Sequence, residues 1–373
     1  MNNNEDITRQ PLPSLTGGVG GGSLVRPCIR ALTPYSCARD EFKGREAKAF
    51  LDANENPFGT LNRYPDPLQT EVKAVLSKVK QVPAENIVLG NGSDEVIDLV
   101  YRIFCEPRID NVVAIEPTYG MYRVCADIND VEYRPVSLNE RFQPDVDAML
   151  AATDEHTKVI WLCSPNNPTG NLLERASIER LLTEFHGIVV VDEAYSDFAD
   201  ARPFRMDLAR WPRMIVLNTF SKCWAAAAIR LGMAFASEEI VGLFNKVKYP
   251  YNVNQLTQQQ ALQILSERQR LDLWRATIIR ERENMLPAFA ELPTCKCVYP
   301  TDANFFLARM TDADKIYKYL IDRGIVVRNR SRVHLCNDCL RITIGTPQEN
   351  NLLLAAMRQY RPTPYPLPGG RGA

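Results

Sequence analysis

One amine and one guanidinium lie in an otherwise uncharged stretch of the chain. Lys222 and Arg230 are the only charged residues of TFSKCWAAAAIRLG, residues 219–232, and the hydroxyls of Thr219 and Ser221 precede or adjoin the lysine. Burial and a neighbouring cation lower the pKa of a lysine, so its amine can act as a nucleophile or a base. A planar guanidinium can bind a phosphate through paired hydrogen bonds. The alternative is a solvated surface segment, but seven consecutive small or apolar residues argue against it.

Short apolar runs indicate the elements that must position these groups. Helical patterns at 94–105, 118–128 and 174–186 separate several of the runs. Near-continuous apolarity is typical of strands covered on both faces, and the alternation predicts a mostly parallel sheet with crossover helices. The predicted strands are NIVLG (86–90), NVVAIE (111–116), KVIWLC (158–163), GIVVVDE (187–193), MIVLN (214–218) and GMAFAS (232–237). Ligands of such sheets gather at the carboxyl ends of the strands, so the polar residues that follow the runs should converge on one cleft.

Those polar residues each have a chemical and a structural interpretation. Ser93 and Asp94, in GNGSDE, open a helix whose free N–H groups attract an anion, although either side chain could simply cap that helix. Asp192 ends an apolar run, where a carboxylate needs a cation or strong donors; it could instead cap the next helix. Tyr195 follows three residues later and can face the same cleft, whereas Asn167, in SPNNPTG, could belong only to a turn.

One chemistry uses all of these groups together. A lysine joins an aldehyde cofactor as a Schiff base, and a carboxylate keeps the ring nitrogen of the cofactor protonated. A tyrosine and an asparagine tune the ring hydroxyl, while a glycine-rich helix start, a serine and an arginine hold a phosphate. The set predicts pyridoxal 5′-phosphate as the cofactor.

The chain resembles the fold-type I pyridoxal-phosphate aminotransferases, and among them most closely the histidinol-phosphate aminotransferases. The resemblance runs from about residue 25 to 360 and keeps the order of the motifs. The matching stretches are ALTPYSCARD (31–40), LDANENPFG (51–59), NRYPDP (62–67), GNGSDE, PTYGMY, CSPNNPTG, VDEAY, SK with an arginine eight residues later, and GIVVRNRSRVHLCNDCLRITIG (324–345).

The resemblance implies roles for the residues of these motifs. Lys222 would be the Schiff-base lysine and proton shuttle, and Asp192 would pair with the ring nitrogen. The other cofactor contacts would be Tyr195 and Asn167 at the ring 3′ oxygen, Tyr119 stacked on the ring, and Ser221, Arg230, Thr219 and the backbone of Ser93 and Asp94 at the phosphate.

Further residues are implied for the substrate and for a partner subunit. Arg341 would bind the carboxylate of glutamate or the phosphate of the amine substrate, with Tyr35, Asn54 and Arg328 as helpers. Arg328 could also form only a surface salt bridge. Tyr64, in NRYP, would reach the cofactor phosphate in the site of the partner subunit, which implies a homodimer.

The resemblance implies transamination between L-histidinol phosphate and 2-oxoglutarate, giving imidazole-acetol phosphate and glutamate, a step of histidine biosynthesis. Two alternatives stay open within this fold: an aminotransferase for aromatic or other amino acids, and an enzyme like threonine-phosphate decarboxylase. A non-catalytic regulator would not need the lysine, and a nicotinamide dehydrogenase would need a glycine fingerprint that the sequence lacks.

Bulk properties bound these expectations. The formal net charge of −1 excludes a global basic field for nucleic acid, and no apolar run approaches the roughly 20 residues of a membrane helix. We read the ten cysteines as reduced thiols of a cytoplasmic protein, and we expect no metal site, because Cys295/Cys297 makes a poor zinc knuckle beside Cys336/Cys339.

The fold expected from the resemblance is α/β and similar to aspartate aminotransferase: a large domain with a mostly parallel sheet between helices, and a smaller α+β domain. The predicted divisions are a flexible arm (1–27), a segment joining the small domain (28–55), the large cofactor-binding domain (56–265), the C-terminal small domain (266–360) and a disordered tail (361–373). The stretch 255–290 reads as long and helical, and we expect it to connect the large domain to the C-terminal one.

Overall fold

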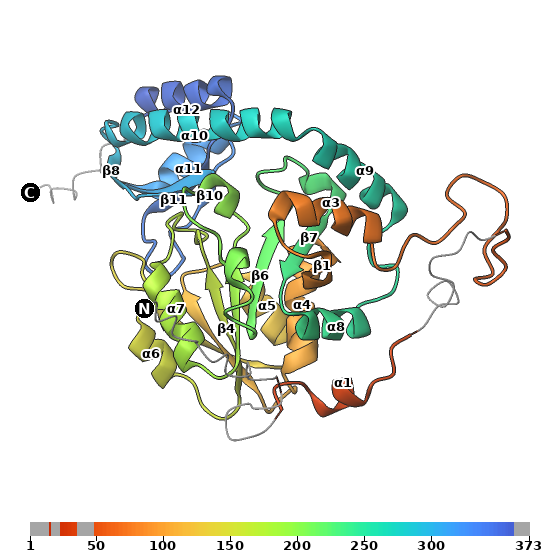
Figure 1. Cartoon of the computed structure of the whole chain (residues 1–373). Coiled ribbons are helices and arrows are strands. Elements are labelled where there is room, and N and C mark those ends of the chain that lie inside the picture. Colours follow the sequence, from red (N-terminus) through yellow and green to blue (C-terminus); the bar gives the residue numbers. More distant parts are fainter. Residues whose placement is uncertain (1–14, 16–22, 36–47, 362–373) are drawn as a thin grey trace, which may run out of the picture.

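The computed structural model describes residue 15, residues 23–35 and residues 48–361 (Figure 1). Two sheets organise this part of the chain, and both carry helices. The larger sheet lies in the lower half of the view, and the smaller one packs against α10 and α12 at the top left (Figure 1).

The larger sheet has seven strands, six of which run in the same direction. Its order is β1-β7-β6-β5-β4-β2-β3, and β7 alone is antiparallel to its two neighbours. The strands are β1 (Ile87–Asn91), β2 (Asn111–Glu116), β3 (Glu132–Ser137), β4 (Thr157–Cys163), β5 (Ile188–Asp192), β6 (Met214–Thr219) and β7 (Leu231–Phe235). The predicted mostly parallel α/β architecture is confirmed.

Helices cover both faces of this sheet, which explains why its central strands are apolar throughout. One face packs against α4 (Gly92–Phe104), α5 (Met121–Ile128) and α8 (Glu238–Val247). The other packs against α3 (Thr70–Lys80), α6 (Val146–Ala151), α7 (Arg175–Glu184) and α9 (Gln255–Ser266). Every residue of β5 and β6 is buried, as expected for strands between two helical layers.

The predicted runs all form strands, within two residues of the predicted ends, but the sequence missed β3. This strand, EYRPVS, lies at the edge of the sheet and is mostly half-buried or exposed, so it lacks an apolar run. Its proline is tolerated because an edge strand has one side without ladder partners.

The smaller sheet is antiparallel and follows the larger one in the chain. Its order is β10-β11-β9-β8, made of β8 (Cys295–Val298), β9 (Phe305–Met310), β10 (Arg328–Asn329) and β11 (Cys339–Thr343). The helices α10 (Arg268–Ala290), α11 (Ala313–Ile321) and α12 (Pro347–Gln359) pack with it around a core of its own. The predicted α+β character of this part is confirmed.

The stretch 255–290 is helical as predicted, and it forms two helices that separate at Glu267. The residue has φ −95° and ψ 28°, at the end of α9 and the start of α10. The first helix packs against α3 beside the large sheet, whereas the second packs against β8 and α12. The change of direction lies near the predicted boundary between 265 and 266, and the boundary itself stays a prediction.

The described part of the N-terminal region packs against the large sheet. Leu24 is only 2% exposed, and the backbone N–H of Arg26 donates to the carbonyl of Ile103 at 3.1 Å. The short helix α1 (Pro27–Ala31) follows, and Lys246 of α8 donates to the carbonyl of Arg30 at 2.8 Å. Residues 23–26 are therefore packed, although they fall in the predicted flexible arm, and α1 contacts α8 of the large-sheet region. The predicted division into domains stays a prediction. The rest of the predicted arm and of the tail, apart from Leu15 and Arg361, lies outside the described residues.

Within the described residues, no helix combines the length and apolarity needed to span a membrane.

Candidate active site

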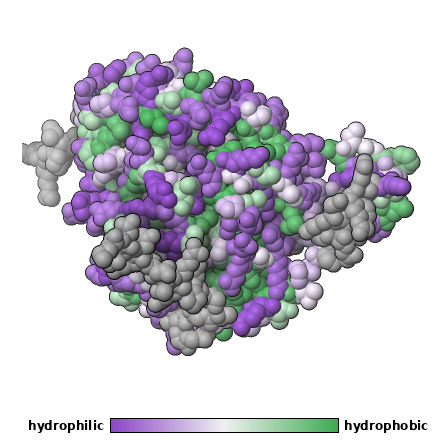
Figure 2. Space-filling model, viewed as in Figure 1, coloured by the Kyte–Doolittle hydropathy of each residue, from purple (hydrophilic) through white to green (hydrophobic). Residues whose placement is uncertain are grey.

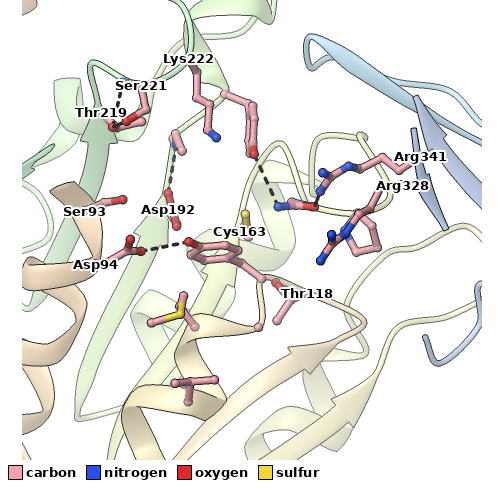
Figure 3. A pocket seen from close by; sticks show the side chains of 18 of the residues that line it. Ser93, Asp94, Thr118, Cys163, Asp192, Thr219, Ser221, Lys222, Arg328 and Arg341 are labelled. Atoms are coloured by element: carbon pink, nitrogen blue, oxygen red, sulfur yellow. Dashed lines mark hydrogen bonds between the residues drawn. The ribbon is translucent and has the colours of Figure 1, made fainter. Parts of the chain in front are cut away.

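A cavity of about 730 Å³ lies at the carboxyl edge of the large sheet, between that sheet and β10 and β11. The strand ends are aligned there, because Cys163 of β4 pairs in register with Asp192 of β5. The structure brings most of the predicted site residues to this cavity: Ser93, Asp94, Tyr119, Asn167, Asp192, Tyr195, Thr219, Ser221, Lys222, Arg230, Arg328 and Arg341 all line it (Figure 3).

Asp192 is a buried carboxylate held by two neutral donors. Its side chain accepts a hydrogen bond from the Tyr122 hydroxyl at 2.6 Å and one from the backbone N–H of Ala194 at 3.0 Å. The residue is 3% exposed, and this burial raises its pKa above the usual range, while the two donors act in the opposite sense. A cation at its free side would remove the cost of burying this charge.

Lys222 extends into the same cavity from the loop that follows β6 (Figure 3). Burial lowers the pKa of its amine, and the positive charge of Arg341 is the next cause; Asp192 and Asp94 act in the opposite sense. Arg230 also lowers this pKa, but Arg341, from the small sheet, has the larger effect.

The start of α4 and the Lys222 loop form one polar end of the cavity. Gly92 has φ +78°, and a Cβ at this position would lie 2.6 Å from a guanidinium nitrogen of Arg230, so only glycine allows the two segments to approach. The N–H of Gly92 donates to the carbonyl of Arg230 at 2.7 Å. The hydroxyl of Thr219 lies 3.1 Å from that of Ser221 on the opposite side. Helix N–H groups, hydroxyls and a guanidinium together suit a phosphate.

Asp94 contributes a carboxylate to this end as well as its backbone. The carboxylate accepts a hydrogen bond from the Tyr119 hydroxyl at 3.0 Å and lies 3.4 Å from Arg230. It does not occupy the N-cap position of α4, because that helix begins at Gly92 and its N-cap residue is Asn91. Asp94 therefore orients Arg230 and Tyr119.

A chain of polar contacts links the cavity floor to the small sheet. Asn167 donates to the Tyr195 hydroxyl at 3.5 Å and accepts from a terminal nitrogen of Arg341 at 2.6 Å. Both Asn167 and Tyr195 are buried, and Tyr195 packs edge-on against Phe305 of β9. Asn167 is thus more than a turn residue, since its amide joins groups from both sheets.

Three arginines occupy the other polar end of the cavity. Arg328 of β10 and Arg341 of β11 pair in register on adjacent antiparallel strands, and Figure 3 shows both guanidinium groups directed into the cavity. Arg330 follows β10 and also lines the cavity. No ion pair joins any of the three to another residue of the described ranges, so Arg328 is not in a surface salt bridge there.

Three predicted residues do not line this cavity. Tyr35 is 73% exposed on the segment after α1, and Asn54 lies in the segment 48–66. Tyr64, in the same segment, stacks on Tyr251 with ring centroids 4.4 Å apart. Their roles stay predictions, and within one subunit the structure provides no support for them.

Two cavity-related residues were missed from the sequence. Tyr122 belongs to the matching stretch PTYGMY, but only the three-dimensional position of its hydroxyl shows that it donates a hydrogen bond to Asp192. Arg330 lies in the matching stretch 324–345, two residues after Arg328. Side chains two residues apart on an extended segment lie on the same face, and this spacing could have indicated that Arg330 lines the cavity beside Arg328. No group of three or more possible metal ligands comes together in the ranges that the structure covers.

The residues present fit pyridoxal 5′-phosphate. Among the described residues, the buried carboxylate of Asp192 forms no ion pair, and a protonated ring nitrogen would supply a cationic partner. The helix start at Gly92 approaches Arg230 closely enough to form a phosphate cradle, and Lys222 supplies an amine of lowered pKa. Asn167 and Tyr195 offer donors for a ring oxygen.

Comparisons with known proteins agree with this geometry. The sequence model of the family "Aminotransferase class I and II" matches residues 40–357. The chain is 59% identical over 339 residues to a histidinol-phosphate aminotransferase of Bacteroides thetaiotaomicron, covering 91% of this chain and 98% of that protein.

Two solved structures share the fold at low sequence identity. One is histidinol-phosphate aminotransferase of Sinorhizobium meliloti in complex with pyridoxal 5′-phosphate (TM-score 0.74, 23% identity, 89% of this chain and 96% of that one). Another is L-threonine-O-3-phosphate decarboxylase of Porphyromonas gingivalis (TM-score 0.68, 23% identity, 80% of this chain and 93% of that one). The family match and the identity to the Bacteroides protein lead to one conclusion: this chain belongs to the class I and II aminotransferase family.

Proposed function

We propose that this chain transfers the amino group of L-histidinol phosphate to 2-oxoglutarate, giving imidazole-acetol phosphate and glutamate, with pyridoxal 5′-phosphate as cofactor. The observation that carries the proposal is the 59% identity, over nearly the whole length of both chains, to a relative of that name. A cavity with one amine, one buried acid and two separate cationic ends supports it, because the cofactor and the substrate each bring an anionic group. The reaction is a step of histidine biosynthesis, and we place it in the cytoplasm, where thiols stay reduced; the described cysteines are all free.

Some residues of the cavity would bind the cofactor, and Lys222 would transfer the proton. When bound, pyridoxal 5′-phosphate supplies an aldehyde for the amino group and a ring that accepts the electron pair left at the substrate carbon. Asp192 would keep the ring nitrogen protonated, and the hydrogen bond from Tyr122 orients Asp192 and favours its ionised form. Lys222 would take up the proton that leaves the substrate carbon and return it to the carbon on the other side of the amino nitrogen, which requires a neutral amine near pH 7.

Groups at the two ends of the cavity would bind the cofactor and the substrate and so fix their orientation. Ser221, Arg230 and the first N–H groups of α4 would hold the cofactor phosphate. Arg341 would bind the anionic group of each substrate in turn, and its contact with Asn167 links that event to the ring oxygen. Its positive charge also lowers the pKa of Lys222.

The test is a panel of amino donors assayed with 2-oxoglutarate. We expect histidinol phosphate to give a kcat/KM well above those of phenylalanine, aspartate and unphosphorylated histidinol. Equal values across the panel would leave a broad aminotransferase and defeat the proposed substrate. Carbon dioxide release from threonine phosphate without any oxo-acid acceptor would instead favour the decarboxylase.

We further propose that the active unit is a homodimer in which Tyr64 serves the site of the partner subunit. The segment 48–66 projects from the body at the right of Figure 1, and Figure 2 shows hydrophobic atoms at its outer end. Leu51 is 94% exposed, Phe58 81% and Leu61 62%. A cluster of this kind on a projecting segment is typical of a surface covered by another chain.

Mixing two inactive variants tests this arrangement. Tyr64→Ala subunits keep Lys222, and Lys222→Ala subunits keep Tyr64, so each mixed dimer regains one complete site. Random reassociation of equal amounts should restore about a quarter of the wild-type activity, since half of the dimers are mixed and each has one good site in two. Activity no greater than the sum of the separate variants would refute a shared site.

A further inference from the structure

We propose that Arg330 is a specificity-determining residue that matches the substrate end of the cavity to a phosphate dianion in preference to a carboxylate. The inference rests on the proposed aminotransferase function and concerns how the same cavity distinguishes its two amino donors. Arg330 follows Arg328 by two residues, and its backbone N–H donates to the carbonyl of Cys339 at 2.8 Å, so the pairing of β10 with β11 continues to this position. Side chains two residues apart on an extended segment lie on the same face.

The arginines form a cluster of like charges without an internal counter-charge. Arg328 lies opposite Arg341 across the two strands, and like charges in that position repel each other. Burial and the charges of these two neighbours lower the pKa of Arg330 to about 10. The Nε atoms of Arg330 and Arg341 are buried and have no hydrogen-bond partner in the described part of the chain. Such an arrangement is stabilised when an anion binds between the guanidinium groups.

The acids of the cavity cannot serve as that anion. Among the described residues that line it, the acids are Asp94 and Asp192. Asp94 is engaged by Tyr119 and Arg230, and Asp192 by Tyr122 and the backbone of Ala194. Within the described ranges, the side chain of Arg341 forms a hydrogen bond only with the neutral amide of Asn167. The counter-ion of the cluster must therefore come from the substrate.

The number of arginines favours phosphate over carboxylate. A carboxylate has one charge and two oxygens, which a single guanidinium can satisfy through two hydrogen bonds. A phosphate monoester carries about 1.5 to 2 charges near pH 7 and has three free oxygens. Arg341 and Arg328 together offer more charge and more hydrogen-bond donors than the carboxylate of glutamate can use. Arg330 therefore adds binding that only the phosphorylated amine uses.

The test compares donors in Arg330→Gln and in Arg332→Gln. Arg332 belongs to the same loop but is exposed and does not line the cavity, so its variant controls for charge loss in the loop. Losing one charge-assisted contact should raise the KM for histidinol phosphate and the inhibition constant of inorganic phosphate by roughly 10- to 100-fold in Arg330→Gln. The KM for glutamate should change less than about 3-fold, and Arg330→Lys should recover part of the phosphate binding.

The outcomes separate this inference from the proposed function. If the wild-type protein does not use histidinol phosphate, the proposed function fails first. If the wild-type protein uses it, but Arg330→Gln raises the KM values for glutamate and histidinol phosphate equally, or raises neither, Arg330 does not determine specificity. An equal loss in Arg332→Gln would show a general effect of loop charge and would also overturn the inference.

Discussion

Removal of the Tyr122 hydroxyl tests whether the chemistry of the cavity depends on an ionised Asp192. Tyr122 donates to the Asp192 carboxylate at 2.6 Å, and in Tyr122→Phe only the backbone N–H of Ala194 remains as a donor. Asp192 is 3% exposed and Tyr122 is fully buried, so the position of the lost hydroxyl lies away from bulk solvent. The variant therefore changes the charge state of the acid while leaving the shape of the site nearly unchanged.

The expected size of the effect follows from that hydrogen bond. A bond to a charged acceptor contributes about 1.5–3 kcal/mol, and one pKa unit corresponds to about 1.4 kcal/mol. The pKa of Asp192, already raised by burial, should rise further when this donor is lost. Because the ionised acid holds the proton on the cofactor ring, kcat should fall by roughly 10- to 100-fold, and the acidic limb of the pH–kcat profile should move to higher pH.

Tyr101→Phe is the matched control. Tyr101 is also fully buried and stacks on the same Trp161, but its hydroxyl donates to the backbone carbonyl of Tyr122 at 2.7 Å and not to Asp192. We would measure kcat between pH 5 and 9 and the cofactor dissociation constant for both variants. If the two variants lose similar activity and show the same pH profile, the reasoning about Asp192 is refuted.

Three further outcomes follow from buried charges. Lys222→Ala should lower turnover at least about 10⁴-fold while the purified variant still binds cofactor by absorbance; near-normal turnover would defeat its assignment as the base. Burial raises the pKa of Glu193 from 4.5 to about 7, so the native protein binds more protons than the unfolded chain between those values and stability falls as pH rises through that window. Glu193→Gln should remove this fall in the free energy of unfolding, which is on the order of 3 kcal/mol. If the melting temperatures of the two proteins decline in parallel from pH 5 to 8, the explanation is contradicted. Lys80 donates to both carboxylate oxygens of Asp197 at 3.0 Å, so Lys80→Met should lose about 3–5 kcal/mol of stability in urea unfolding because it leaves a buried charge unpaired. The double variant Lys80→Met/Asp197→Leu should recover most of this loss. A double variant no more stable than Lys80→Met would exclude the unpaired charge as the cause.

The elements of the large sheet were predictable because burial on two faces leaves a local signature. Each central strand is a short run of β-branched and apolar residues, and the carboxyl ends of parallel strands share an edge. That rule alone placed Asp192, Lys222 and Ser93 in one cleft. The edge strand β3 left no such signature, and the break at Glu267 did not interrupt the helical pattern of its flanks.

Contacts between separate elements were decided only by the tertiary structure. The residue nearest in sequence to Lys222 with a positive charge is Arg230, but Arg341, more than a hundred residues later, lowers its pKa more. The partner of Asp192 is Tyr122, from a helix seventy residues earlier. Electrostatic interactions and hydrogen bonds depend on distance in space, and a burial pattern along the chain records which faces are covered but not which side chains meet there.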